Sequence, residues 1–281
     1  SLTQLLAKWP APVYGLDDIS ALPKTAVKNP RLGLYQSWRG NMDEGWTRFV
    51  FDDLGIAFTT LHNKDFKGTK DKKVDLKAAY DVIVFASEGA EVIKTGRPPA
   101  RSGFARFMTP MPPEFEGGID KEGVEALKKF AEAGGRVVLL NGACELGSKD
   151  LEAPARNVLE QVERTRFFCP TSLLRLNVDP TTPIGYGLAE ETAAMFVGSQ
   201  AFDTWSPPVE WDRKVVASYP EDDILLSGWL LGGDMIARKA AVVDTTFKKG
   251  HIILIGIRSQ HRAQSHGTYK FLLNALLYPG M

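Results

Sequence analysis

Cys144 is the residue whose type and position are best suited to nucleophilic chemistry. It follows residues 136–140, an apolar run that predicts a buried strand, and it opens a segment that predicts a helix. A thiol on a strand-to-helix turn lies close to backbone N–H groups, which can stabilise an oxyanion. Such a nucleophile also needs a base held by a third group. The chain offers four histidines, His62, His251, His261 and His266.

A second set of polar residues follows other predicted strands. Ligands of parallel sheets bind outside the carboxyl ends of the strands, and the planar guanidinium of arginine suits a carboxylate or a phosphate. These residues therefore predict a crevice for a peptide or a small anionic ligand. The alternative is that they only hydrogen-bond the last helix to the sheet. The candidate ligand-binding residues are Trp38, Arg39, Asn41, Ser87, Glu88, Arg258, Gln260, Arg262 and His266.

Residues 32–61 predict a strand, a helix and a second strand. Asn41 or Asp43 can cap the helix, because a short side-chain oxygen accepts from a free backbone N–H. The spacing of the apolar residues predicts one buried helical face, and Gly55 predicts its end. A unit of this kind builds a parallel sheet. The predicted buried face consists of Trp46, Phe49, Val50 and Leu54.

The rest of the chain alternates predicted strands and helices, which indicates an α/β layered fold. We expect a flavodoxin-like, doubly wound, mostly parallel sheet with an inserted β-rich region at about 167–240. That region contains a predicted helix at 190–195. Residues 1–30 predict an N-terminal arm or linker, and 31–281 one domain. Further predicted strands are 81–87, 136–140, 240–245 and 251–257, the last two joined by a hairpin turn at 248–250. Further predicted helices are 118–131 and 267–278. Their predicted buried faces are Val124, Leu127, Phe130 and Ala131 in the first, and Phe271, Leu272, Ala275 and Leu276 in the second.

Composition limits the possible partners. The 281 residues include 34 basic and 34 acidic side chains, so no global field favours nucleic acid. No apolar run reaches the ~18 residues that would span a bilayer. Cys144 and Cys169 are too few for a disulfide framework; they could form one disulfide or both be buried thiols. The chain begins at Ser1, from which we expect a fragment or a processed product.

Two stretches resemble a known family: LGLYQSWRGNMDEGWTRFVFDDLG at 32–55 and GIRSQHRAQSHGTYKFLLNALLY at 256–278, with APARNVL, RFFCPTSLLRLNVD and TPIGYGL between them. They are similar to the C-terminal domain of bacterial zinc carboxypeptidase-like proteins of the carboxypeptidase A type. The resemblance implies a fold like that of type 1 glutamine amidotransferases. It also implies an upstream peptidase domain that carries the zinc, and a periplasmic or secreted parent protein. No metal site or cofactor is expected in this chain, which lacks a His-x-x-Glu motif.

The same resemblance assigns the candidate catalytic pair, Cys144 as nucleophile and His261 as base. At both residues the chain differs from the sequence pattern of catalytically active amidotransferases. Amidotransferases have His-Pro-Glu where this chain has His261-Arg262-Ala263, and glycine where it has Leu146. A non-catalytic accessory or binding domain is therefore the first hypothesis. The alternatives are a cysteine-dependent amidase that uses Cys144 and His261, and an oligomerisation module formed through 167–240.

Overall fold

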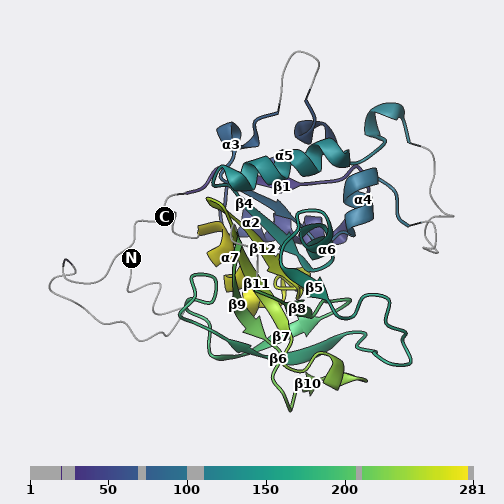
Figure 1. Cartoon of the computed structure of the whole chain (residues 1–281), viewed down its shortest axis with the longest axis vertical. Helices are drawn as coiled ribbons and strands as arrows, with labels where there is room; N and C mark the ends of the chain where they lie inside the picture. Colours follow the sequence, from purple (N-terminus) through teal and green to yellow (C-terminus); the bar gives the residue numbers. More distant parts are fainter. Residues whose placement is uncertain (1–19, 21–28, 69–73, 100–110, 207–210, 278–281) are drawn as a thin grey trace.

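The computed structural model describes residue 20 and residues 29–68, 74–99, 111–206 and 211–277 (Figure 1). Most of the predicted arm at 1–30 therefore lies outside the described residues. The strands are β1 Leu32–Tyr35, β2 Thr59–Leu61, β3 Val82–Phe85, β4 Arg136–Leu140, β5 Ala155–Asn157, β6 Ser172–Val178, β7 Glu191–Phe196, β8 Phe202–Thr204, β9 Trp211–Ser218, β10 Leu225–Ser227, β11 Ala240–Phe247 and β12 Gly250–Ile255. The α-helices are α2 Met42–Asp53, α3 Leu76–Ala79, α4 Ala90–Thr95, α5 Asp120–Glu132, α6 Cys144–Lys149 and α7 Tyr269–Leu277. Short 3₁₀ turns are η1 Asn63–Phe66, η3 Pro113–Phe115, η4 Asn141–Ala143, η5 Gly233–Met235, η6 His261–Ala263 and η7 His266–Thr268.

The strands form one 12-stranded mixed sheet, in which nine strands follow the order β10-β6-β9-β11-β12-β4-β3-β1-β2. The other three lie off this path: β7 pairs with β6, β8 with β11, and β5 with β8. Neighbours from β2 to β12 run parallel, whereas every pairing beyond β12 is antiparallel. The expectation of a flavodoxin-like, mostly parallel sheet is wrong. The hairpin between β11 and β12 reverses the chain direction, and the β-rich region extends the same sheet with antiparallel strands. In Figure 1 these strands form the lower half of the molecule.

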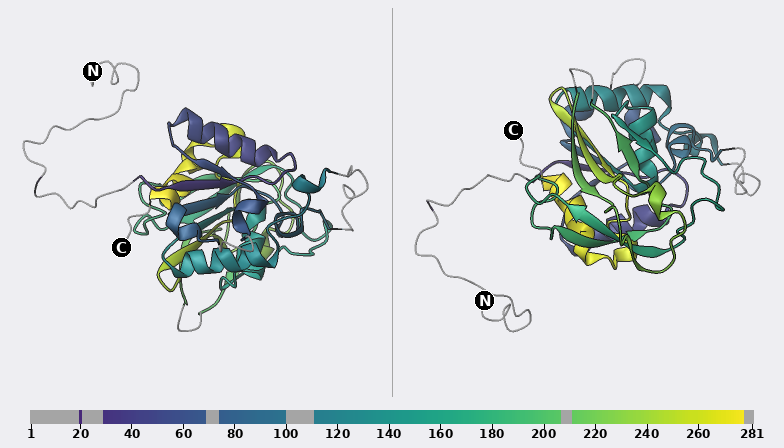
Figure 2. Two further views of the ribbon diagram at one scale, coloured as in Figure 1. Left: turned by 90° about the horizontal axis from the view of Figure 1, so that it is seen from above. Right: turned by 60° about the horizontal axis from the view of Figure 1, so that its bottom comes forward.

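The parallel half of the sheet is covered on both faces. Alternate residues along each strand point to opposite faces, so each strand contributes to two cores. Phe51 of α2 and Phe271 of α7 belong to the core on one face, with Leu34 and Val84 from the strands. α5 and α6 belong to the other core, which includes Ile83. The left view of Figure 2 shows the helices above and below the sheet. Side chains of β6, β7 and β9 join the core of α2 and α7, so both halves of the sheet share one hydrophobic core.

Several predicted elements are confirmed. β1 and β2 pair in parallel around α2, Asn41 caps α2, and Gly55 follows its end at φ 67°. Helix α5 buries Val124, Leu127, Phe130 and Ala131, and α7 buries Phe271, Leu272, Ala275 and Leu276, as the spacing predicts. Phe247 pairs with Gly250 across Lys248 and Lys249, which confirms the hairpin. Strong amphipathic patterns thus located these elements correctly.

Two local predictions are wrong. Residues 190–195 were expected to be helical, but Glu191–Phe196 forms β7, which pairs along β6. Pairing with a long neighbouring strand outweighs the helix propensity of so short a segment. The buried face of α2 is also rotated from the expected one, because Glu44, Thr47, Val50 and Phe51 are buried. Phe49 and Leu54 are 51% and 48% exposed.

Candidate functional site

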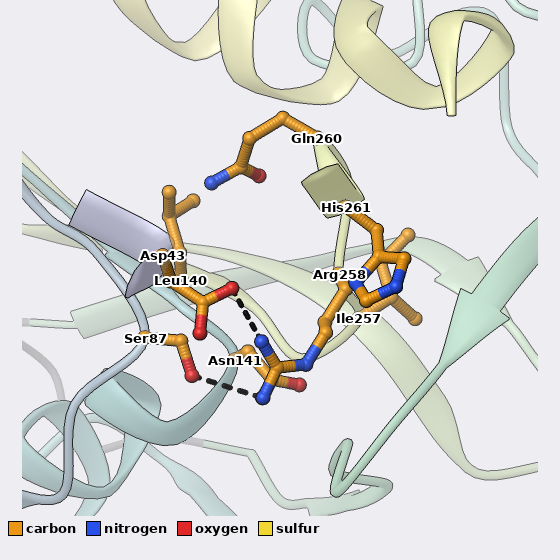
Figure 3. Close-up of a pocket in the computed structure, with 8 residues that line it drawn as sticks. All are labelled: Asp43, Ser87, Leu140, Asn141, Ile257, Arg258, Gln260 and His261. Carbon is orange, nitrogen blue, oxygen red and sulfur yellow. Dashed lines mark hydrogen bonds and ion pairs between the residues drawn. The ribbon is translucent and has the colours of Figure 1, made fainter. Parts of the chain in front are cut away.

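The carboxyl ends of β1, β3, β4 and β12 meet at one edge of the sheet, because these neighbours run parallel. The ends of β3, β4 and β12 and the residues that follow them supply most of the lining of a small pocket, and the first turn of α2 supplies Asp43 (Figure 3). The side chains fill it so completely that no room for a water molecule remains. The pocket is lined by Asp43, Ser87, Leu140, Asn141, Ile257, Arg258, Gln260 and His261.

An ion pair closes this pocket. Nη1 of Arg258, in the loop after β12, contacts Oδ1 of Asp43, in the first turn of α2. Both side chains are 20% exposed. Nε of Arg258 donates to the carbonyl of Val197 at 2.8 Å, which leaves the two Nη groups to face the pocket and Asp43. The pair therefore joins the last parallel strand to the helix that follows the first one.

Asn141 occupies the turn between β4 and α6. Its φ is 46°, a left-handed conformation that asparagine adopts more readily than most residues. With the amide nitrogen toward β12, it donates to Ser199 Oγ at 2.9 Å and to the Gly256 carbonyl at 3.1 Å. The amide oxygen then accepts from Ser87 Oγ at 3.1 Å and from Gly142 N–H at 3.2 Å. Asn141 is thus the strained residue at the strand-to-helix elbow.

Cys144 lies three residues beyond the elbow and outside the pocket. It is fully buried in the core beneath α6, and Sγ donates to the Leu139 carbonyl at 3.1 Å. Burial raises the pKa of the Cys144 thiol well above its ordinary value. Neither Cys144 nor His261 hydrogen-bonds the other, and both belong to the described part of the chain. The structure does not bring the predicted catalytic pair together. Cys169 is also a free, buried thiol.

His261 opens the turn η6 and contributes to the pocket wall. Its Nδ1 is buried and has no hydrogen-bond partner among the described residues. Burial, followed by the positive charge of Arg258, lowers the pKa of His261 below its ordinary value of 6.5. The imidazole is therefore neutral near pH 7, with a nitrogen available for one further hydrogen bond.

The other predicted residues of the last loop have structural contacts. Gln260 is buried; it donates to Thr47 Oγ1 at 2.8 Å and accepts from Ser259 Oγ at 2.7 Å. His266 is exposed, with Nε2 3.1 Å from the Ala263 carbonyl. Arg262 is exposed and left-handed, with φ 49°, and it does not line the pocket. Of the predicted residues in this loop, Arg258, Gln260 and His261 reach the pocket.

The predicted residues after β1 lie beside the pocket rather than in it. Trp38 stacks on His62, with ring centroids 3.8 Å apart, and Arg39 Nε donates to the Gly96 carbonyl. Asn41 accepts from the backbone N–H groups of Asp43 and Glu44 at 3.0 and 3.3 Å, which caps α2. These contacts fix the wall of the crevice and the start of the helix that carries Asp43.

Glu88, after β3, is the most perturbed carboxyl of this region. Its Oε1 accepts from Ser37 Oγ at 2.8 Å, which joins the loop after β3 to the loop after β1. Burial raises the pKa of Glu88, and the Ser37 hydrogen bond opposes that shift in part. A carboxyl whose pKa is higher in the folded chain than in the unfolded chain stabilises the fold fully below its unfolded pKa. It loses that contribution as the pH rises through its folded pKa.

Replacing Glu88 by glutamine should therefore stabilise the protein near neutral pH. Glutamine keeps an oxygen acceptor for Ser37 and removes the buried charge. We expect a higher melting temperature for the variant near pH 7, and no difference below about pH 4, where both side chains are neutral. Thermal melts across this range measure the effect, with Glu91→Gln, an exposed position on α4, as the control. A variant that melts lower near pH 7 would show that the charge of Glu88 contributes to the fold.

Two polar pocket residues, Asp43 and Asn141, were in neither the predicted binding set nor the predicted catalytic pair. Asp43 was considered only as a helix cap. Asn141 carried a signal, since Asn-Gly directly after a predicted strand marks a left-handed turn position. In the described residues, no group of three or more His, Cys, Asp or Glu side chains is arranged to bind a metal. Nor does any described helix have the length and apolarity needed to cross a bilayer.

Comparison with known proteins defines the fold alone. No protein-family model matches this chain, and no curated protein is significantly similar to it. Two proteins of Salmonella typhimurium described as cytoplasmic have similar folds. One is 12% identical with a TM-score of 0.52, covering 89% of this chain and 99% of that one. The other is 11% identical with a TM-score of 0.51, covering 89% and 98%. A ThuA-like protein of Bacteroides uniformis is 14% identical with a TM-score of 0.47, covering 91% and 94%.

The two Salmonella proteins are matched over nearly their whole length. The likeness in fold therefore extends over whole chains, although the sequences are only 11% and 12% identical. Neither Salmonella protein is described as a zinc carboxypeptidase, and the resemblance to that family rests on the sequence segments alone.

Proposed function

We propose that this chain is a non-catalytic binding module whose ligand site is the pocket at the carboxyl ends of the parallel strands. The observation that supports this proposal most directly is that the residue at the elbow between β4 and α6 is an asparagine, Asn141. Asn141 holds the left-handed position between β4 and α6, and a carboxamide is not a nucleophile under physiological conditions. The nearest thiol, that of Cys144, is buried and bonded to the backbone.

We further propose, from the sequence resemblance, that the module belongs to a zinc carboxypeptidase-like protein that is exported from the cytoplasm. Its peptidase domain would lie upstream and hold the zinc. The pocket would then serve as an accessory site for a peptide end or a small anion, rather than as a second reaction centre. Arg258 supports an anionic ligand, because its Nη groups face the pocket and the carboxylate of Asp43 already pairs with one of them there.

The test is the reactivity of Cys144 together with amide hydrolysis. Native protein treated with iodoacetamide near pH 7 is expected to leave Cys144 unmodified, because a buried thiol of raised pKa has almost no thiolate. The same protein in urea should react at both Cys144 and Cys169, which peptide mass spectrometry would report. Ammonia release from glutamine should equal the buffer blank.

Cys144→Ala is the control for hydrolysis. Rapid native alkylation of Cys144, or ammonia release that disappears in Cys144→Ala, would replace the binding-module proposal with the cysteine amidase. A trace activity that persists in Cys144→Ala would come from a contaminant or from another site, because the variant lacks the thiol.

A further inference from the structure

The ion pair between Arg258 and Asp43 joins two elements that are far apart in sequence and adjacent in space. Arg258 follows β12, whereas Asp43 lies in the first turn of α2. The pair is largely shielded from solvent, each side chain being 20% exposed. The carboxylate of Asp43 therefore occupies the position on the Arg258 guanidinium that the carboxylate of a ligand would need.

Beside this pair lies a buried ring nitrogen that has no hydrogen-bond partner among the described residues. Nδ1 of His261, on the pocket wall, is buried and unpartnered among the described residues. A buried polar atom without a hydrogen bond lowers the stability of the fold, so such atoms are uncommon in protein interiors. A second such atom is close to the pocket: Gln200 donates to the Asn141 carbonyl at 3.0 Å, while its own Oε1 is buried without a partner in the described chain. Both atoms can accept from an N–H group.

We propose that this pocket binds a small monocarboxylate that carries an N–H donor beside the carboxylate, the chemistry shared by a free amino acid and the last residue of a peptide. The carboxylate takes the place of Asp43 on Arg258, and the N–H donates to Nδ1 of His261. This deepens the proposed function, on which it rests, by naming the ligand chemistry of the same site.

Charge favours a monoanion over a phosphate. One guanidinium faces the pocket, and the first turn of α2 places the acidic residues Asp43 and Glu44 beside it. A dianion would meet these carboxylates with twice the repulsion, whereas one carboxylate matches the two Nη donors of one arginine. The neutral state of His261 near pH 7 suits a neutral acceptor for N–H.

A ligand can bind in this pocket only if the pocket opens. The space between the lining side chains does not admit a water molecule, so the ligand enters only when the Arg258–Asp43 pair separates. Asp43 is then a competitor of the ligand. Removing its charge should make binding tighter, which a merely damaged protein cannot do.

Calorimetric titration with N-acetylglycine, glycine and acetate tests the proposal. Asp43→Asn, which keeps the side-chain shape, should bind N-acetylglycine or glycine about two- to fivefold tighter than the unmodified protein, the range expected for a lost competing ion pair. Arg258→Gln should weaken that binding about tenfold or more, because a charge-assisted pair is lost. Arg262→Gln removes an exposed arginine four residues away and should leave the affinity within about twofold.

The three probes separate the parts of the site. Preference for N-acetylglycine identifies a peptide end, and preference for glycine identifies a free amino acid; either supports the proposal. Acetate binding as tightly as both would overturn the role of His261. No saturable binding by Asp43→Asn at millimolar concentrations, or equal losses in Arg258→Gln and Arg262→Gln, would overturn the site. These failures would remove this ligand from the pocket but leave the non-catalytic part of the proposed function standing, because that part fails only if hydrolysis depends on the Cys144 thiol.

Discussion

Replacing Phe51 by alanine is expected to lower the free energy of unfolding by about 3–5 kcal/mol, the usual cost of removing a buried phenylalanine. Phe51 is fully buried under α2, in the core shared with α7. Its ring lies 5.6 Å from that of Phe58, between centroids. The alanine variant leaves a cavity that this packed layer can only partly collapse. Urea unfolding followed by circular dichroism measures the change.

Phe49→Ala on the same helix is the matched control. Phe49 is 51% exposed, so its removal should alter stability by no more than about 0.5 kcal/mol. The two variants delete the same group two residues apart, and helix propensity changes equally in both. Equal losses would show that α2 is rotated toward the face predicted from the sequence, in which Phe49 and not Phe51 was buried.

Replacing His251 by alanine is the second change expected to have a large effect. His251 Nδ1 lies 2.8 Å from Asp244 Oδ1 across the β11–β12 hairpin, and both residues are buried. The variant leaves the Asp244 carboxylate in the sheet without this partner. Loss of one member of a buried polar pair typically costs about 3–5 kcal/mol. Thermal or urea unfolding near pH 7 would record it.

A double-mutant cycle shows whether the cost comes from the pair. The variant His251→Ala with Asp244→Ala should be more stable than the sum of the two single losses implies, because no carboxylate then remains to be desolvated. Strict additivity would contradict this account and assign the losses to separate packing defects. Lys214→Ala, at the position of β9 that pairs with Asp244, is an exposed control expected to cost far less.

The sequence predicted best where a pattern admitted a single solution. In α5 the apolar residues lie on one stripe, and the four residues predicted to be buried are all buried, together with Gly123. In α2 apolar residues occur on more than one side, so spacing alone could not select the face. The tertiary contacts of Thr47 with Gln260 and of Glu44 with Gln36 settle which residues face inward. A polar residue can be buried when a partner from elsewhere in the chain bonds to it.

The fold class failed for a related reason. The hairpin at 248–250 was predicted, and it implies that β11 runs antiparallel to β12. Whether 167–240 forms a separate unit or extends the sheet depends on strand pairings distant in sequence, such as β9 with β11 and β6 with β9. Periodicity reports which face of a strand is buried, but it carries no information on the neighbour to which the strand bonds.

For the candidate site, too, the sequence predicts some features, and others depend on the tertiary structure. The residue types and the strand ends that carry them could be inferred from the sequence, since apolar runs followed by Ser87, Asn141 and Arg258 predict where the chain leaves the sheet. That Asn141 takes the elbow while Cys144 is buried depends on one left-handed backbone angle. That Arg258 meets Asp43 depends on the crossing of α2 over the end of β12, which brings together residues 215 positions apart. Local propensity is encoded along the chain, whereas such contacts exist only once the sheet is complete.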